Sequence, residues 1–150
     1  MQILEFSGNN RWLSNFSRVP IEDENRIFSS LEHAYQARKT EDPTEKDLIQ
    51  GAGTPGKAKR LGQKVTLRPD WNEIRVDVMR TLLEKKFANR HLHHLLRGTR
   101  NTHIEEGNNW GDTFWGISPP GSGIGENMLG KLIMEIRADI RMGVLDGKGW

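Results

Sequence analysis

The sequence contains no cysteine among its 150 residues, and this absence excludes several kinds of site. It excludes a disulfide framework, thiol catalysis, and zinc or iron–sulfur centres held by cysteine. The chain also lacks any apolar run near the roughly 18–20 residues that cross a bilayer. Its first residues show no basic segment followed by an apolar stretch, so we expect no signal peptide. These absences predict a cytoplasmic protein that does not associate with membranes.

The chain also has only a small excess of one sign of charge over the other. The chain has 22 Lys and Arg residues against 20 Asp and Glu residues, which gives a formal net charge of +2. Such a small excess does not by itself indicate a nucleic-acid surface. The sequence shows no repeat, low-complexity segment or linker, and a chain of this length can bury about two thirds of its unfolded surface. We therefore expect a single domain over residues 1–150.

Apolar residues recur mainly at helical spacing, with a few short alternating runs between them. The alternating runs predict strands at residues 3–6, 26–28 and 65–67. The helical spacing predicts helices that start at Ser29, Pro43, Pro55 and Asp70, a helical stretch around residues 92–96, and a last helix over 127–142. Residues 107–125 are rich in glycine, proline, tryptophan and asparagine and should be irregular. The fold class that fits is α+β: a compact, helix-rich domain with a few short strands.

Residues suited to helix N-caps precede several of these helices. Ser29 with Glu32, and Asp70 with Glu73, fit the spacing of a capping box. Thr54 followed by proline is a signal for a cap and a first helical position.

Two carboxylates stand out as candidates for chemistry, Glu32 in the first helix and Asp112 in the irregular segment. Cleavage of a glycosidic bond uses a pair of carboxylates about 5–9 Å apart. The two residues are far apart in the sequence, so spacing alone does not bring them together. Each has a structural alternative, because Glu32 can serve in the capping box and Asp112 can be a turn residue.

Aromatic and basic residues suggest a ligand that is flat and carries phosphate. Trp110 and Trp115 in the irregular segment could form walls for a ring, or could plug the edge of the core. Lys57 and Lys59 lie in the basic helix after Thr54, where a phosphate could bind, although a solvated helix face is the alternative. The glycine-rich segment 121–125 could hold a phosphate or simply form a turn.

Histidines give little indication of a metal site. Only His91 and His94 have the helical spacing that lets two ligands converge, and no acidic residue lies in register nearby.

Several blocks occur together in an order that resembles one known family. They include SSLEHAYQARK, GTPGKAKRLGQKV, LRPDWNEIRVDVMRTLLEKKF, IEEGNNWGDTFWG and GENMLGKLIMEIR, within residues 5–137. The chain is thereby similar to the YbiA-like, or NADAR, family. The resemblance implies a compact α+β domain that hydrolyses N-glycosidic bonds. Family members cleave phosphorylated pyrimidine intermediates of riboflavin synthesis, and others are linked to removal of ADP-ribose from guanine bases.

The resemblance also assigns roles to residues. It implies a catalytic role for Glu32 and Asp112. It implies contacts with a small-molecule substrate for a further set: Asn15, Lys57, Lys59, Trp71, Trp115 and Asn127. It implies no metal and no other cofactor, and it leaves ADP-ribosylated nucleic acid open as a partner.

Two other classes of function remain open from the sequence. The same tryptophans and lysines would suit a non-catalytic module that binds ADP-ribose or a nucleotide. Exposed tryptophans could instead form a protein-interaction surface.

Overall fold

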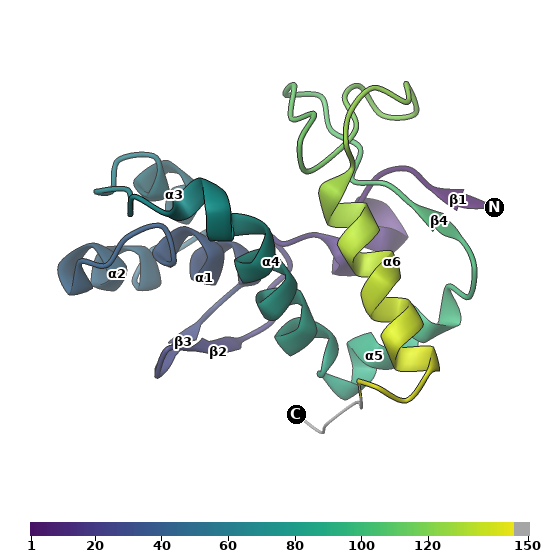
Figure 1. Cartoon of the computed structure of the whole chain (residues 1–150), viewed down its shortest axis with the longest axis horizontal. Helices are drawn as coiled ribbons and strands as arrows, with labels where there is room; N and C mark the ends of the chain where they lie inside the picture. The colour runs from purple at the N-terminus through teal and green to yellow at the C-terminus, as the bar shows by residue number, and fades with distance from the viewer. Residues whose placement is uncertain (146–150) are drawn as a thin grey trace. The chain divides into compact units, whose positions relative to one another are not determined.

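The computed structural model describes residues 1–145 and is shown in Figure 1. Contacts between Cα atoms divide the chain into two units. One unit is Asn15–Lys86, and the other combines Met1–Ser14 with the chain from Phe87 onward. The expectation of a single domain over residues 1–150 stays a prediction. The α+β fold class is confirmed, because helices predominate in the described residues and the strands are two or three residues long.

The Asn15–Lys86 unit begins with a β-hairpin. Strands β2 (Ile21–Asp23) and β3 (Arg26–Phe28) pair antiparallel, with Asp23 opposite Arg26. The two residues between them, Glu24 and Asn25, both have positive φ, as a tight type I′ hairpin turn requires. The sequence predicted β3 but missed β2, which has only three residues.

Three short helices follow and pack on one another: α1 (Leu31–Ala37), α2 (Pro43–Gln50) and α3 (Pro55–Gly62). The predicted proline starts are confirmed for α2 and α3, where Asp42 and Thr54 cap the helices by accepting hydrogen bonds from backbone N–H groups. The long helix α4 (Trp71–Phe87) starts where predicted, and most of its apolar stripe is buried. Its last residue belongs to the other unit.

Two predictions for the Asn15–Lys86 unit were wrong. The first helix is capped by Ser30 rather than Ser29, so Ser29 and Glu32 form no capping box. The predicted strand at 65–67 is absent, and within residues 1–145 no strand lies beside it to pair with. The backbone N–H of Thr66 instead donates to the carboxylate of Glu45 (3.0 and 3.1 Å).

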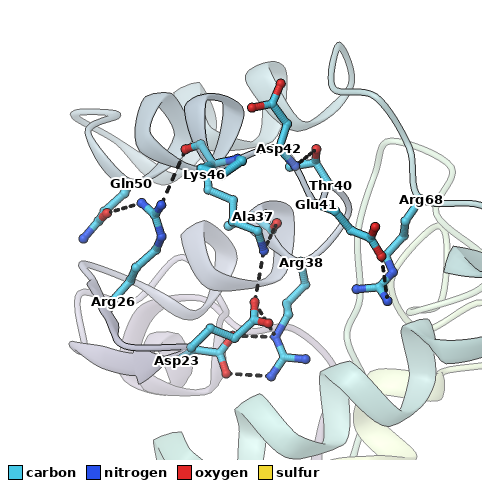
Figure 2. Close-up of polar contacts among 12 residues, drawn as sticks. Asp23, Arg26, Ala37, Arg38, Thr40, Glu41, Asp42, Lys46, Gln50 and Arg68 are labelled. Atoms are coloured by element: carbon cyan, nitrogen blue, oxygen red, sulfur yellow. Dashed lines mark hydrogen bonds and ion pairs between the residues drawn. The ribbon is translucent and has the colours of Figure 1, made fainter.

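An ion-pair network joins the hairpin to the helices of this unit (Figure 2). The buried carboxylate of Asp23 accepts two hydrogen bonds from Arg38 (2.5 and 2.7 Å) and one from Lys85 (2.9 Å). Burial by itself would raise the pKa of Asp23, but these donors outweigh it and hold the pKa below its ordinary value. Arg26 reaches α2 by donating to Asp47 (2.6 Å) and Gln50 (2.8 Å).

The other unit contains two more helices and a short parallel sheet. Helix α5 (Arg90–Gly98) is capped by Asn89 and packs on α6 (Met128–Arg141). Strand β1 (Gln2–Ile3) pairs with β4 (His103–Ile104) in parallel. The strand predicted at 3–6 therefore ends earlier than expected. Residues 8–13 form a short 3₁₀-helix, η1 (Gly8–Leu13).

The segment 107–125 is irregular, as predicted, apart from one isolated bridge between Gly107 and Ile117. Its carbonyl groups cap α6, whose N-cap residue offers no side-chain hydrogen bond. The N–H groups of Met128 and Leu129 donate to the carbonyls of Phe114 and Trp115 (both 3.0 Å). The irregular segment thus satisfies helix donors that would otherwise lack a partner.

Candidate active site

Glu32 lies in the first turn of α1, a helix whose seven residues are all buried. Ser30 caps the helix by accepting a hydrogen bond from the N–H of His33 (3.2 Å). The N–H of Glu32 donates to the carbonyl of Asn15 (3.1 Å), which brings two predicted site residues together. Ser30, and not Ser29, therefore provides the side-chain cap of α1.

The carboxylate of Glu32 is buried and is held by its neighbour one helical turn on. Nε2 of Gln36 donates to Oε2 of Glu32 (2.5 Å). Gln36 is in turn pressed against α3, where a Cβ atom on Gly62 would lie only 1.9 Å from Oε1 of Gln36. The close approach of α1 to α3 therefore holds the amide of Gln36 in place, and this amide in turn orients the carboxylate of Glu32.

Two buried amide oxygens in this region have no hydrogen-bond partner among the described residues. They are Oδ1 of Asn15 and Oε1 of Gln36. The Nδ2 group of Asn15 has only a weak acceptor, the sulfur of Met79 (3.6 Å). Buried amide oxygens normally have a partner. The oxygen of Gln36 faces α3, whereas that of Asn15 belongs to the residue whose carbonyl accepts the Glu32 N–H.

Aromatic and basic side chains continue the same face of α1. The rings of Tyr35 and Trp71 are tilted against each other with centroids 5.2 Å apart. The Nζ atom of Lys39 lies 5.8 Å from the centroid of the Tyr35 ring. Burial lowers the pKa of Lys39; the charge of Glu32 opposes this shift and the charge of Lys59 adds to it. Lys39 therefore lies within electrostatic range of both residues.

The predicted substrate residues of this unit differ in accessibility. Trp71 is only 5% exposed, so its ring is part of the core whether or not it also contacts a ligand. Lys59 is half-buried, whereas Lys57 is exposed on α3. The roles of these three residues in substrate binding stay predictions.

In the other unit, Asn108 organises the tryptophan-containing segment. Its buried side chain accepts hydrogen bonds from the N–H groups of Trp110 and Asp112, and it donates to Glu106 (3.0 Å) and to the carbonyl of Asp112 (2.9 Å). Oδ1 of Asp112 accepts hydrogen bonds from the N–H groups of Phe114 (3.1 Å) and Trp115 (2.9 Å). Asp112 thus shapes a turn, which was the structural alternative, and its catalytic role stays a prediction.

The other two predicted pocket residues of this unit also have structural contacts. The half-buried ring of Trp115 meets that of Phe114 edge to face, with centroids 4.9 Å apart. Asn127 is buried with positive φ, accepts a hydrogen bond from the N–H of Glu106 (3.0 Å) and donates to the carbonyl of Ile104 (2.9 Å). Both polar atoms of its side chain are therefore used in joining β4 to the start of α6.

The weaker ligand patterns gain no support. Within residues 1–145, no three histidine, aspartate or glutamate side chains gather as a group that could hold a metal ion. In the segment 121–125, the three glycines all have positive φ, in line with the turn alternative. Among the same described residues, no helix has the length and apolar character needed to cross a membrane.

Comparison with known proteins shows to which family the chain belongs. The NADAR domain family matches residues 5–141. The chain belongs to the NADAR family. The NMR structure of YbiA from Escherichia coli is similar to the structure of this NADAR chain, with a TM-score of 0.82 and 30% sequence identity. The similarity covers 97% of this chain and 86% of that one.

Curated relatives of this NADAR chain carry two kinds of name. The N-glycosidase Npun_R5314 of Nostoc punctiforme is 35% identical over 85% of this chain and 84% of its own length. The N-glycosidase YbiA of Escherichia coli is 33% identical over 85% of this chain and 79% of its own length. The riboflavin biosynthesis protein VVA0006 of Vibrio vulnificus is 35% identical over 89% of this chain, which spans only 36% of that protein.

Sequence reasoning missed two residues beside Glu32, namely Gln36 and Lys39. Neither belongs to a motif that indicates chemistry by itself. The signal for Gln36 was the register of α1, because it lies four positions after Glu32 and so shares its helix face. Lys39 lies in the turn after the helix, where no such spacing applies.

Proposed function

We propose that this NADAR chain is an N-glycosidase that hydrolyses the bond between a ribose phosphate and a nitrogen of a flat heterocycle. It is a hydrolase of N-glycosyl bonds, like the relatives that carry that name. Its candidate substrates are phosphorylated ribosylamino-pyrimidine intermediates of riboflavin synthesis and ADP-ribosyl adducts of guanine. The name of the Vibrio vulnificus relative favours the first.

The observation that carries this proposal is the buried carboxylate of Glu32. A buried carboxylate is costly, and Nε2 of Gln36 donates to the carboxylate of Glu32 and orients it within α1. The unpartnered amide oxygen of Asn15 lies on the residue whose carbonyl accepts the Glu32 N–H. Hydrolysis at an anomeric carbon needs a positioned carboxylate, and an amide oxygen without a partner is available to accept a hydrogen bond from the substrate.

In the proposed reaction, water attacks the anomeric carbon as the carbon–nitrogen bond breaks through an oxocarbenium-like state. The water oxygen bonds to the sugar, and its proton passes by way of a carboxylate to the departing nitrogen. Glu32 would activate the water or stabilise the cation. Asp112 would supply the second carboxylate, and Asn15, Trp71, Trp115 and Asn127 would contact the substrate.

The test incubates the protein separately with the phosphoribosylamino-pyrimidine, an ADP-ribosylated guanine oligonucleotide and free ADP-ribose. Mass spectrometry then follows the release of base and sugar. We expect Glu32→Gln to lower turnover by at least about a hundredfold, because the contribution of a general acid or base is typically 10²–10⁴-fold. The amide keeps the shape of the side chain, so the fold and much of the ligand affinity should remain.

The matched control is Glu22→Gln, which changes an exposed glutamate of β2. It should leave turnover unchanged. Full activity of Glu32→Gln would sink the mechanism. If no substrate is cleaved while ADP-ribose still raises the melting temperature, the chain is a binding module rather than an enzyme.

A further inference from the structure

The amide of Gln36 lies between the carboxylate of Glu32 and the backbone of Gly62, all within the Asn15–Lys86 unit. Its Nε2 donates to Oε2 of Glu32 (2.5 Å), and both side chains are buried. Its Oε1 lies 1.9 Å from the place that a Cβ atom on Gly62 would take, and this oxygen has no hydrogen-bond partner among the described residues. The nitrogen of the amide therefore faces the carboxylate, and the oxygen faces α3.

This orientation of the amide is the one that matches an ionised Glu32. An ionised carboxylate only accepts hydrogen bonds, so its natural neighbour is the nitrogen end of an amide. A protonated carboxyl group has an O–H to donate, and the amide turned by half a turn would offer its oxygen to that proton. A hydrogen bond donated to the charged form of an acid is also the stronger one, and it favours that form.

The charges around α1 act on Glu32 in both directions. Burial opposes the ionised form of Glu32, because a charge in a poorly solvated place is costly. Burial also lowers the pKa of Lys39, in the turn after α1; the charge of Glu32 opposes that shift, and the charge of Lys59 on α3 adds to it. Glu32 and Lys39 in their charged forms therefore stabilise each other.

Other charged groups on the elements around α1 pair with one another. These pairs, from the β2–β3 hairpin, α2, α4 and the end of α1, are Asp23 with Arg38 and Lys85, Arg26 with Asp47, and Lys46 with Glu24.

We propose that Gln36 is a positioning residue that keeps Glu32 ionised, so that Glu32 acts as the base toward water and not as the acid toward the departing nitrogen. This inference rests on the proposed function and names the role of one of its two carboxylates. The water oxygen bonds to the anomeric carbon and gives a proton to Glu32, while the electron pair of the broken carbon–nitrogen bond stays on the nitrogen. The nitrogen takes its proton from the second carboxylic acid, and the proton on Glu32 returns to that group through solvent.

The ionisation of Glu32 can be measured without turnover. In protein isotope-labelled at the side-chain carboxyl carbon of glutamate, the NMR signal that Glu32→Gln removes belongs to Glu32, and its pH titration gives the midpoint of ionisation. We expect the midpoint to rise by about 1–2 pH units in Gln36→Met, the shift for losing one hydrogen bond to a charged group. Gly62→Ala, which displaces the same amide without removing it, should shift the midpoint in the same direction.

The matched control is Gln63→Met, the same substitution at the exposed residue that follows α3. It should leave the midpoint of Glu32 unchanged. Circular dichroism confirms that each variant is folded.

The dependence of kcat/KM on pH separates this role from a merely structural one. Below its midpoint a base is protonated and activity falls, so the acid limb of the profile should move with the titration. At pH values below both midpoints, Gln36→Met should be slower than wild type by about tenfold to a hundredfold, and above both it should recover most of the activity. A loss of packing alone would lower the rate by the same factor at every pH.

Three results would overturn the inference. They are an equal midpoint in wild type and Gln36→Met, a pH profile that falls without moving, and a wild-type Glu32 that stays protonated where the enzyme is active. The last result would make Glu32 the acid. If none of the candidate substrates is cleaved, the proposed function fails, and the titration alone decides for or against Gln36.

Discussion

The contact between Gly62 and Gln36 predicts that one methyl group on α3 will disturb the carboxylate on α1. A Cβ atom at position 62 would lie 1.9 Å from Oε1, 2.7 Å from Cδ and 3.0 Å from Cβ of Gln36. The backbone at Gly62 has no positive φ, so alanine fits the helix conformation and the clash alone is tested. In Gly62→Ala, Gln36 must therefore move.

The size of the effect follows from what Gln36 would give up. Gln36 is 2% exposed and donates to Glu32, so moving its amide breaks a hydrogen bond to a buried carboxylate. Losing such a bond, or overpacking in its place, costs about 1–3 kcal/mol. Alanine recovers at most about 1 kcal/mol through its higher helix propensity. With that full recovery subtracted, we expect Gly62→Ala to lower the free energy of unfolding by up to about 2 kcal/mol.

Gly56 gives the matched control in the same helix. A Cβ atom there would meet only the side chains of Arg60 and Thr54, at 3.9 and 4.0 Å, which is ordinary contact. Gly56→Ala should be neutral or stabilising by up to about 1 kcal/mol. Urea denaturation of both variants measures the difference in their free energy of unfolding. Turnover reports the effect on Glu32, and we expect turnover to fall in Gly62→Ala only.

A double-mutant cycle tests the cause. In a Gln36→Ala background the two closest contacts of the methyl group, at 1.9 and 2.7 Å, are removed and only the 3.0 Å contact with Cβ remains. Gly62→Ala should therefore cost less there, and the two substitutions should couple by about 1–3 kcal/mol. Equal stability of Gly62→Ala and Gly56→Ala, or additive effects in the cycle, would refute the reasoning.

Two further predictions concern Asp112 and Lys86. Asp112→Asn keeps an Oδ1 acceptor for the N–H groups of Phe114 and Trp115, so this variant should fold normally yet lose turnover. Asp112→Ala should lose turnover and also about 1–2 kcal/mol of stability, as capping substitutions do. Full turnover of Asp112→Asn in the mass-spectrometric assay would leave Asp112 as a turn residue. Burial lowers the pKa of Lys86 to about 7, so between pH 7 and its ordinary 10.5 the unfolded chain binds the extra proton and stability rises with pH. Relative to Lys86→Met, the wild-type free energy of unfolding should rise by about 2 kcal/mol from pH 7 to pH 9, at about 1.4 kcal/mol per pH unit above the midpoint. Urea denaturation of both proteins measures this. If their free energies of unfolding differ by the same amount at every pH in that range, the lowered pKa of Lys86 is contradicted.

Helix starts were predictable where the signal is local. Proline at a first helical position marks α2 and α3 whatever surrounds them, and both starts are confirmed. At α1 the sequence offers two adjacent serines, and either could cap. His33 settles the choice: its Nδ1 lies 2.6 Å from Oγ of Ser30, and its Nε2 donates to the carbonyl of Ala52 (2.9 Å). That carbonyl is distant in the sequence, so no local pattern could reveal the correct cap.

The strand at 65–67 failed for a similar reason. Its residues have the β-branched character of a strand, but a strand needs a neighbour, and the N–H of Thr66 instead finds the carboxylate of Glu45 from α2. Of the candidate site, Glu32 and Asp112 stood out in the sequence as carboxylates, and resemblance to a family assigned them a catalytic role that stays a prediction. The roles of Gln36 and Gly62 depend on two helices touching, which motif and spacing do not encode.

Helix α1 is held in place by contacts with other segments more than by the helix propensity of its own residues. A helix of seven residues is not stable alone in water, so packing must hold it. All seven of its residues are buried, and three of them are polar: Glu32, His33 and Gln36. The imidazole of His33 is accounted for by Ser30 and Ala52, which fix the helix in place. Glu32 and Gln36 hydrogen-bond to each other, an arrangement that two apolar residues would replace at lower cost in a purely structural core. The catalytic role proposed for Glu32 would give the buried carboxylate and its amide support a purpose that packing alone does not.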